Sequence, residues 1–272
     1  MEDGAASPLW EEKAYAAPSV FRPENLLREG RRQRGRPDEP VPEVCILDPD
    51  GDVVAHLTRG GRARPHGGWG CFHTTLHAFD LAGVEVGIVG HAVGAPFAVL
   101  VAEQLAAAGC SLVISLTSAG AVHAGAEPVP FVIVERALRD EGTSLHYLPP
   151  GTWAAAPPHL LEGMVRALHR HDRPVVAGAT WTTDAPYRET EQAIARAAGL
   201  GIIAVEMEAA GLYAYAQACQ RDVLCLAHLT NIMATGGDDF EKGDHAGAIG
   251  ALDLIGDTIA HLQRVRPSTM RA

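Results

Sequence analysis

The sequence predicts a single three-layer α/β/α domain with a mixed central sheet. Apolar runs of strand length alternate with segments of helical periodicity, and the 272 residues are too few for two typical domains and a linker. Because apolar strands that alternate with helices must be covered on both faces, helices should lie on either side of the sheet. We expect an irregular N-terminal arm (1–42) with one short helix, the domain (43–266) and a tail (267–272).

Local signals predict the first elements. In the arm, Pro23 to Arg34 has helical potential, with proline in the first turn. Val44 to Leu47 reads as a buried strand that ends in the turn Asp48-Pro49-Asp50-Gly51. Val53 to Leu57 is expected to form a second strand. A Gly/Arg-rich loop at 59–70 and a hairpin of residues 73–81 and 84–89 should follow.

The rest of the chain repeats a strand and helix alternation. A helix at 94–108 and an apolar strand from Ser111 to Leu116 complete a βαβ unit. Ligands of such sheets sit at the carboxyl ends of the strands, so candidate functional residues should lie just after strands. Further strands are expected at 129–134, 174–178, 202–205 and 223–229, and helices at 158–170, 187–198, 206–219 and 246–264.

Composition narrows the function. The net charge of −11 argues against a nucleic-acid partner, since backbone binding relies on Lys and Arg. Neither a signal-peptide pattern nor a long apolar window is present, so we expect no secretion and no membrane partner. The five scattered cysteines predict a reduced, cytoplasmic protein without a metal site. Sequence motifs of covalent hydrolases, P-loop NTPases and zincins are missing.

Glu206-Met207-Glu208 is the first candidate site, directly after an apolar strand. A carboxylate there can accept hydrogen bonds from two sugar hydroxyls, and Met207 offers a soft apolar floor for the ring. The alternative is that both acids serve only the helix N-terminus.

Three further strand ends carry polar residues. Thr182, Thr183 and Asp184 offer hydroxyls and a carboxylate beside an aromatic residue, which suits a nucleobase, although a helix cap is the alternative. Ser118, in a run of small residues, is a candidate for binding an oxyanion or a water. Asn231 can hydrogen-bond a base, although such residues also form turns. Gly94 and His228 lie in the same strand-end segments.

Together and in this order, these motifs resemble the nucleoside phosphorylase and nucleosidase superfamily over about residues 43–264. The most specific piece is Val205 to Ala210. The resemblance implies that Glu208 binds the ribose 2′- and 3′-hydroxyls, that Met207 packs on the sugar and that Ser118 faces the acceptor. It also implies that Thr182, Thr183 and Asp184 border the base, and that Glu206, Gly94 and His228 complete the substrate site.

The implied chemistry is cleavage of a nucleoside's N-glycosidic bond, with the ribosyl group passed to phosphate or water. The enzyme would be a pentosyltransferase or an N-glycosyl hydrolase without metal or organic cofactor, and inorganic phosphate would be the candidate co-substrate. Members of the superfamily are oligomers, so a dimer-based homo-oligomer, up to a hexamer, is expected.

Departures from the family pattern leave the acceptor open. The family's two phosphate-binding arginines are missing, because the first turn reads Asp48-Pro49-Asp50-Gly51 and Ser115 stands at the second position. A dianion needs cationic partners, which favours water. Candidates for the phosphate or water site are Ser118, Asp48, Arg59, Arg62 and Arg64, the arginines from this chain or a neighbour.

Asn231 stands where purine-specific members carry a general-acid aspartate. An amide cannot donate a proton as an acid does, but it can stabilise a departing base. Catalytic roles are therefore expected for Glu208, Asn231 and Ser118. Two rival hypotheses stay open. The first is a non-catalytic nucleoside sensor, and the second is an unrelated Rossmann-type domain, which would need a G-x-G-x-x-G turn after the first strand.

Overall fold

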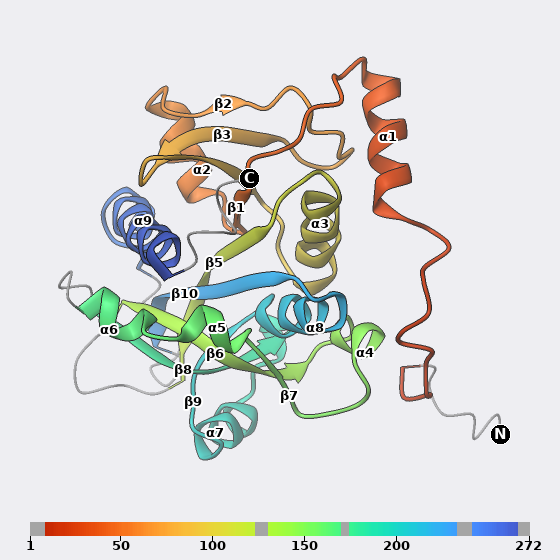
Figure 1. Cartoon of the computed structure of the whole chain (residues 1–272). Coiled ribbons are helices and arrows are strands. Elements are labelled where there is room, and N and C mark those ends of the chain that lie inside the picture. Colours follow the sequence, from red (N-terminus) through yellow and green to blue (C-terminus); the bar gives the residue numbers. More distant parts are fainter. Residues whose placement is uncertain (1–8, 123–129, 170–173, 233–240, 266–272) are drawn as a thin grey trace.

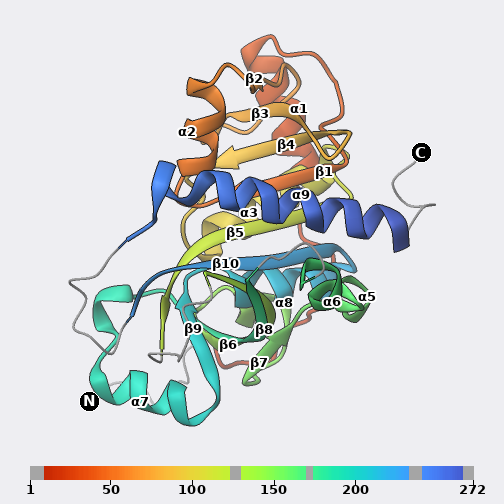
Figure 2. The ribbon, with the colours of Figure 1, turned by 90° about the vertical axis from the view of Figure 1, so that its left-hand side faces the viewer.

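The computed structural model describes residues 9–122, 130–169, 174–232 and 241–265, and it confirms the predicted three layers (Figure 1). One hydrophobic core lies between the sheet and helices α3 (Ala95–Ala107) and α8 (Ala209–Cys219). A second core lies on the opposite face, under α2 (Asp52–Arg59), α6 (Met164–His169) and α9 (Ala248–Val265). Figure 2 shows α9 lying along that face.

The central sheet is mixed, and part of it closes on itself. Its strand order is β10-β6-β8-β9-β5-β1-β4-β3-β2, with β7 on β6. Because β10 also pairs with β5, the strands β5, β9, β8, β6 and β10 form a ring. The strands are β1 (Val44–Asp48), β2 (Arg64–Pro65), β3 (Leu76–Leu81), β4 (Val84–Gly90), β5 (Leu112–Ala121), β6 (Phe131–Asp140), β7 (Trp153–Ala155), β8 (Val175–Thr183), β9 (Ile202–Glu206) and β10 (Asp222–Ile232).

Residues 53–57, predicted as a strand, belong to helix α2. Val53 and Leu57 are buried one helical turn apart, and Asp48 Oδ2 accepts the N–H of Val54 at 2.9 Å. The prediction was wrong because a β-branched pair after a turn suggests a strand, whereas the four-residue spacing of the buried side chains belongs to a helix.

Four strands run well beyond their predicted ends, namely β5, β6, β8 and β10. The strand after Ser111 continues to Ala121, because both of its edges stay paired, to β10 and at Gly120 to Val205 of β9. The strand from Val175 extends to Thr183 for the same reason, between β6 and β9. Ser118, Thr182 and Thr183 therefore lie within strands and not in loops.

Helix boundaries also shift. The helix predicted at 158–170 is divided into α5 (Pro158–Leu161) and α6, with Gly163 between them at φ 71°. The helix predicted at 187–198 becomes a 3-10 turn, η1 (Pro186–Arg188), followed by α7 (Glu191–Gly199), which Thr190 caps. Shorter or later elements are α4 (Ser144–Tyr147) and η3 (Asp244–Gly247).

The arm folds back onto the domain through α1 (Pro23–Arg34), which begins and ends where predicted. Arg31 donates to the carbonyl oxygens of Gly68 and Glu39, both at 2.8 Å, and Arg34 donates to that of Cys71 at 2.7 Å. Arg31 and Arg34 of α1 thus hold the arm against the domain. The boundary at residue 42 stays a prediction, and residues 267–272 lie outside the described ranges.

Three global features bear on the function. None of the described helices combines the length and apolarity needed to cross a membrane. The described ranges contain no group of three His, Cys, Asp or Glu side chains placed to hold a metal ion. All five cysteines are free thiols, and four of them are buried.

Candidate active site

Both carboxylate oxygens of Glu206, at the end of β9, accept hydrogen bonds from groups of the protein. One oxygen accepts the hydroxyls of Thr180 (3.1 Å) and Thr182 (2.5 Å), and the other accepts the N–H groups of Glu208 and Ala209 (both 2.7 Å). Burial raises the pKa of Glu206, and these hydrogen bonds oppose the rise. Each oxygen already accepts two bonds. The geometry therefore assigns Glu206 to support of the bend before α8 instead of the predicted substrate contact.

Glu208, in that bend, presents a buried oxygen without a protein partner. Oε1 accepts the N–H of Gly94 at 2.7 Å, whereas Oε2 makes no hydrogen bond to any described residue. The residue is 1% exposed. Burial and the nearby Glu206 charge raise the pKa of Glu208 to about 8, against the opposing effects of the Gly94 N–H and the Thr117 hydroxyl. A buried oxygen of this kind marks a place for a hydrogen-bonding ligand.

The sheet register brings the Glu208 bend towards Ser118. β5 and β9 are antiparallel, with Gly120 opposite Val205, so residues after Val205 approach residues before Gly120. Met207, half-buried, therefore lies beside this part of β5. Gly94, with φ 84°, stands at the N-terminus of α3 and directs its N–H to Glu208. Glu208, Gly94 and Ser118, predicted from separate motifs, are thus brought to one place.

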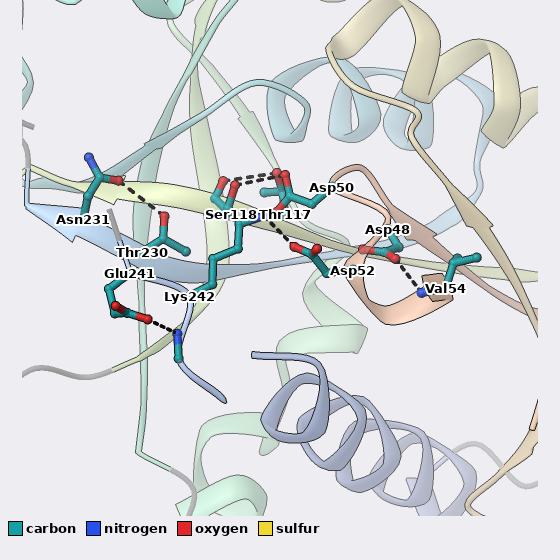
Figure 3. A network of polar contacts seen from close by, with 11 residues as sticks. Asp48, Asp50, Asp52, Val54, Thr117, Ser118, Thr230, Asn231, Glu241 and Lys242 are labelled. Atoms are coloured by element: carbon teal, nitrogen blue, oxygen red, sulfur yellow. Dashed lines mark hydrogen bonds and ion pairs between the residues drawn. The ribbon is translucent and has the colours of Figure 1, made fainter. Parts of the chain in front are cut away.

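A polar cluster of Ser118, Asp50, Asp52 and Lys242 adjoins this place (Figure 3). Ser118 Oγ donates to Asp50 Oδ1 at 3.1 Å. Lys242 Nζ lies 3.2 Å from Asp50 Oδ2 and 2.5 Å from Asp52 Oδ2. The Asp50 charge contributes to the raised pKa of Glu208, so the cluster and that carboxyl are within electrostatic reach. The predicted acceptor-facing serine is thus bound to a carboxylate and not to a cation.

Asp48 has an internal role. Its Oδ2 binds the N–H of Val54 at the start of α2, and its carbonyl oxygen accepts the N–H groups of Gly51 (2.9 Å) and His91 (3.0 Å). Burial raises the pKa of Asp48 to about 6, against the Val54 hydrogen bond. Asp48 therefore fixes the turn that carries Asp50, where we had predicted a phosphate or water contact.

His228 and Asn231 lie on β10, next to β5. His228 is opposite Ser118, and Asn231 is opposite Gly120 after a register shift. The His228 ring stacks on Phe131 with 4.9 Å between centroids, and burial together with the Lys242 charge lowers the pKa of this histidine. His228 thus packs beside the cluster, on the ring of Phe131.

The Asn231 amide is oriented by its neighbour, because the Thr230 hydroxyl donates to its Oδ1 at 3.3 Å. The carbonyl oxygen of Thr230 in turn accepts the N–H of Glu241, at 2.7 Å. The segment that carries Lys242 is therefore joined to the end of β10 (Figure 3).

The residues predicted to border the base have different environments. Thr182 is buried, donates to Glu206 and accepts the N–H of Ala210 at 2.9 Å. Thr183 accepts the N–H of Ala185 at 3.1 Å, which shapes the turn after β8. Both hydroxyls therefore serve the scaffold, which agrees in part with the capping alternative.

Asp184 is exposed and accepts the N–H of Gly142 at 2.9 Å. It lines a cavity of about 490 Å³ together with side chains of the arm, α3 and α4. Glu208, Ser118 and Asn231 do not line this cavity. The structure therefore does not bring Asp184 to the carboxyl of Glu208.

The arginines considered for phosphate lie elsewhere in this chain. Arg64 forms an exposed ion pair with Glu85 at 2.6 Å, near the start of β4, whereas the site lies beyond the end of that strand. Arg59 and Arg62 are exposed and follow the last turns of α2, whose first turn is the one beside the cluster. None of these three arginines replaces the missing pair within this chain, because they lie at the wrong end of α2 or β4.

Sequence reasoning missed Lys242 and placed Asp50 only in the turn after the first strand. Lys242 stands in a polar stretch without periodicity. Its ion pair with Asp52 spans 190 positions of the chain, so no local pattern announces it. A signal existed for Asp50 alone, as an acid directly after a buried strand.

Comparison with known proteins shows the family of this chain. A model of the phosphorylase superfamily matches residues 43–252. A DeoD-type purine nucleoside phosphorylase of Myxococcus xanthus is 30% identical over 156 residues, which cover 57% of this chain and 65% of that protein. A guanosine phosphorylase of Halorubrum lacusprofundi is 27% identical over 135 residues, which cover 50% and 56%. The matched segments thus span less than two thirds of either relative.

Solved structures share the fold. A purine nucleoside phosphorylase from Toxoplasma gondii, in complex with immucillin-H, has a TM-score of 0.71 at 16% identity, covering 84% of this chain and 93% of that chain. A uridine phosphorylase from Vibrio fischeri has a TM-score of 0.64 at 19% identity, covering 84% and 91%. The predicted family resemblance and fold are confirmed.

Proposed function

The chain belongs to the phosphorylase superfamily, and from this premise we propose that it cleaves the N-glycosidic bond of a nucleoside. The observation that carries the proposal is the buried Oε2 of Glu208, which has no hydrogen-bond partner among the residues that the structure describes. A pair of ribose hydroxyls would supply the missing hydrogen bonds. Purine nucleosides are the proposed substrates, since the relatives named above are purine nucleoside and guanosine phosphorylases.

The proposed roles follow the geometry. Glu208 holds the ribose and Met207 packs on it, while Ser118 lies on the acceptor side. The C1′–N bond breaks with its electron pair passing to the base, and an acceptor oxygen then bonds to the electron-poor C1′. Asn231 stabilises the departing base through its amide. Fixed dipoles and the surrounding carboxylates stabilise the cationic sugar, so no cofactor is required.

A panel of purine and pyrimidine nucleosides, assayed by chromatography with and without phosphate, tests this function. We expect free base from at least one purine nucleoside, and a loss of activity in Glu208→Ala but not in Arg64→Ala. Absence of base release from the whole panel contradicts the proposal. Thermal stabilisation by a nucleoside without any turnover would instead support the non-catalytic sensor.

A homo-oligomer, dimer-based and up to a hexamer, remains part of the proposal. Large apolar side chains are exposed on the arm and beside or on α3, and burial between subunits would stabilise them. They are Val20, Phe21, Val93 and Leu100. Light scattering after size-exclusion chromatography should give a mass above that of one chain. A cytoplasmic location also stays a prediction.

A further inference from the structure

The polar cluster of Ser118, Asp50, Asp52 and Lys242 lies on the proposed acceptor side of the site. Its charged side chains are partly accessible, at 20% for Lys242, 28% for Asp50 and 32% for Asp52. Three elements distant in sequence meet there, namely the turn after β1, strand β5 and the segment before η3. A small molecule can therefore reach the cluster, while the fold holds its polar groups in place.

Glu208 independently indicates that a ligand binds beside this cluster. Its carboxyl is nine-tenths or more buried and keeps Oε2 without a hydrogen-bond partner among the described residues. The Thr117 hydroxyl, next to Ser118 in the chain, interacts with that carboxyl, and so does the charge of Asp50. The Glu208 carboxyl and the Asp50 carboxylate therefore lie within electrostatic reach of each other.

The charges of the cluster disfavour a phosphate dianion. Within the described part of the cluster, the Lys242 ammonium is bound by two carboxylates, so its charge is more than offset. The turn after the first strand, Asp48-Pro49-Asp50-Gly51, contains no arginine, and Ser115 stands at the second position where the family resemblance implies a phosphate-binding arginine. Among the described residues, a dianion placed beside Ser118 would meet the carboxylates of Asp50 and Asp52, and like charges repel strongly in a partly buried site. A neutral water molecule meets no such penalty.

We propose that this cluster makes water the acceptor, with Asp50 as the general base and Lys242 as the residue that positions it. This inference rests on the proposed nucleoside cleavage. Asp50 takes a proton from a water molecule held by Ser118, and the water oxygen bonds to C1′. The C1′–N bond breaks with its electron pair on the base, which is then protonated by the proton that Asp50 releases. The products are free ribose and free base.

Product analysis in ¹⁸O-labelled water distinguishes the two acceptors. The wild-type protein should release ribose labelled at C1′, at the same rate in phosphate-free buffer and in saturating phosphate. Ribose 1-phosphate that forms in proportion to added phosphate overturns the assignment of water and leaves nucleoside cleavage standing. No base release under either condition overturns nucleoside cleavage, and this inference with it.

Variants then test the two residues. Asp50→Asn should lower kcat by roughly 10²-fold or more, the usual contribution of a general base, while nucleoside binding by thermal shift persists. Lys242→Met removes the positive charge beside Asp50 and should shift the pH profile of kcat. Lys242→Arg keeps that charge and should give the wild-type profile. Lys13→Met is the matched control, since Lys13 lies in the arm and donates to the carbonyl of Leu9. Unchanged kcat in Asp50→Asn, or an unchanged pH profile in Lys242→Met, contradicts the assigned role.

Discussion

The two ends of the site are built in different ways. At the end that we propose to bind ribose, the ribose end, Glu206 and Glu208 are buried, and short hydrogen bonds from hydroxyls and main-chain N–H groups fix their positions. At the end proposed to hold the acceptor, the acceptor end, Asp50 and Lys242 are partly exposed and held mainly by charge. The ribose end depends on the course of β9 and α8 and is therefore as stable as the fold. The acceptor end depends on a few side chains, so substitution can change its chemistry without disturbing the scaffold.

The largest effect on stability is expected at the ribose end. Glu206→Ala leaves two hydroxyls and two N–H groups without their acceptor, and it should lower the free energy of unfolding by about 3 to 5 kcal/mol. Urea denaturation at neutral pH measures this. Glu208→Ala is the matched control, because it removes one main-chain hydrogen bond, from the Gly94 N–H. Equal losses of unfolding free energy in the two variants would contradict the assignment of structural support to Glu206 alone.

Glu208 should instead dominate catalysis. Glu208→Ala removes the proposed acceptor of two ribose hydroxyls, each bond worth about 1.5 to 3 kcal/mol, so kcat/KM should fall by about 10²-fold or more. Steady-state base release measures the loss. Arg64→Ala, at an exposed ion pair away from the site, should keep wild-type kinetics. A wild-type kcat/KM in Glu208→Ala would contradict the assignment of ribose binding to this residue.

The buried Glu208 also predicts a pH dependence of stability. Its pKa rises from 4.5 in the unfolded chain to about 8 in the folded one, so between these values the folded state binds more protons. The stability contribution is therefore full below pH 4.5 and is lost as the pH rises through 8. In denaturant titrations at pH 6 and pH 9, Glu208→Gln should lose less stability than wild type, by on the order of a few kcal/mol. An equal decline of the unfolding free energy in both proteins would show that a group other than Glu208 causes the pH dependence.

The smallest effect is expected from the charges of the acceptor end. Lys242→Met should change the free energy of unfolding by about 1 kcal/mol or less, because partly exposed ion pairs contribute little. The difference should shrink as salt is added. Denaturation at low and high ionic strength, with Lys13→Met alongside, measures it. A loss comparable to that in Glu206→Ala would show that Lys242 is part of the scaffold.

Much of the fold could be predicted because its signals are local. Val44 to Leu47 is apolar throughout, and α1 begins with proline and ends before glycine, so short windows identify them. The ends of β5 and β8 were missed because they depend on partner strands that a window does not contain.

The site divides in the same way. The Glu206–Glu208 segment was recognisable, but its two acids are separated by a single residue, so the sequence does not show which of them faces the ligand. The packing of the two carboxyls in the fold decides this. Asp184 and the three arginines were proposed from residue type alone and lie away from Glu208 in this chain. Lys242 required knowledge that the segment before α9 returns to the turn after β1.

The ring of strands leaves the sheet open at β2, and that end is poorly suited to recruit another strand. Arg64 carries a charge, and Pro65 has no N–H to donate to a neighbouring strand. The arginine that the sequence suggested for phosphate thus stands at the place where edge-to-edge aggregation would start. A charged side chain and a proline at this edge oppose its pairing with a strand of another molecule.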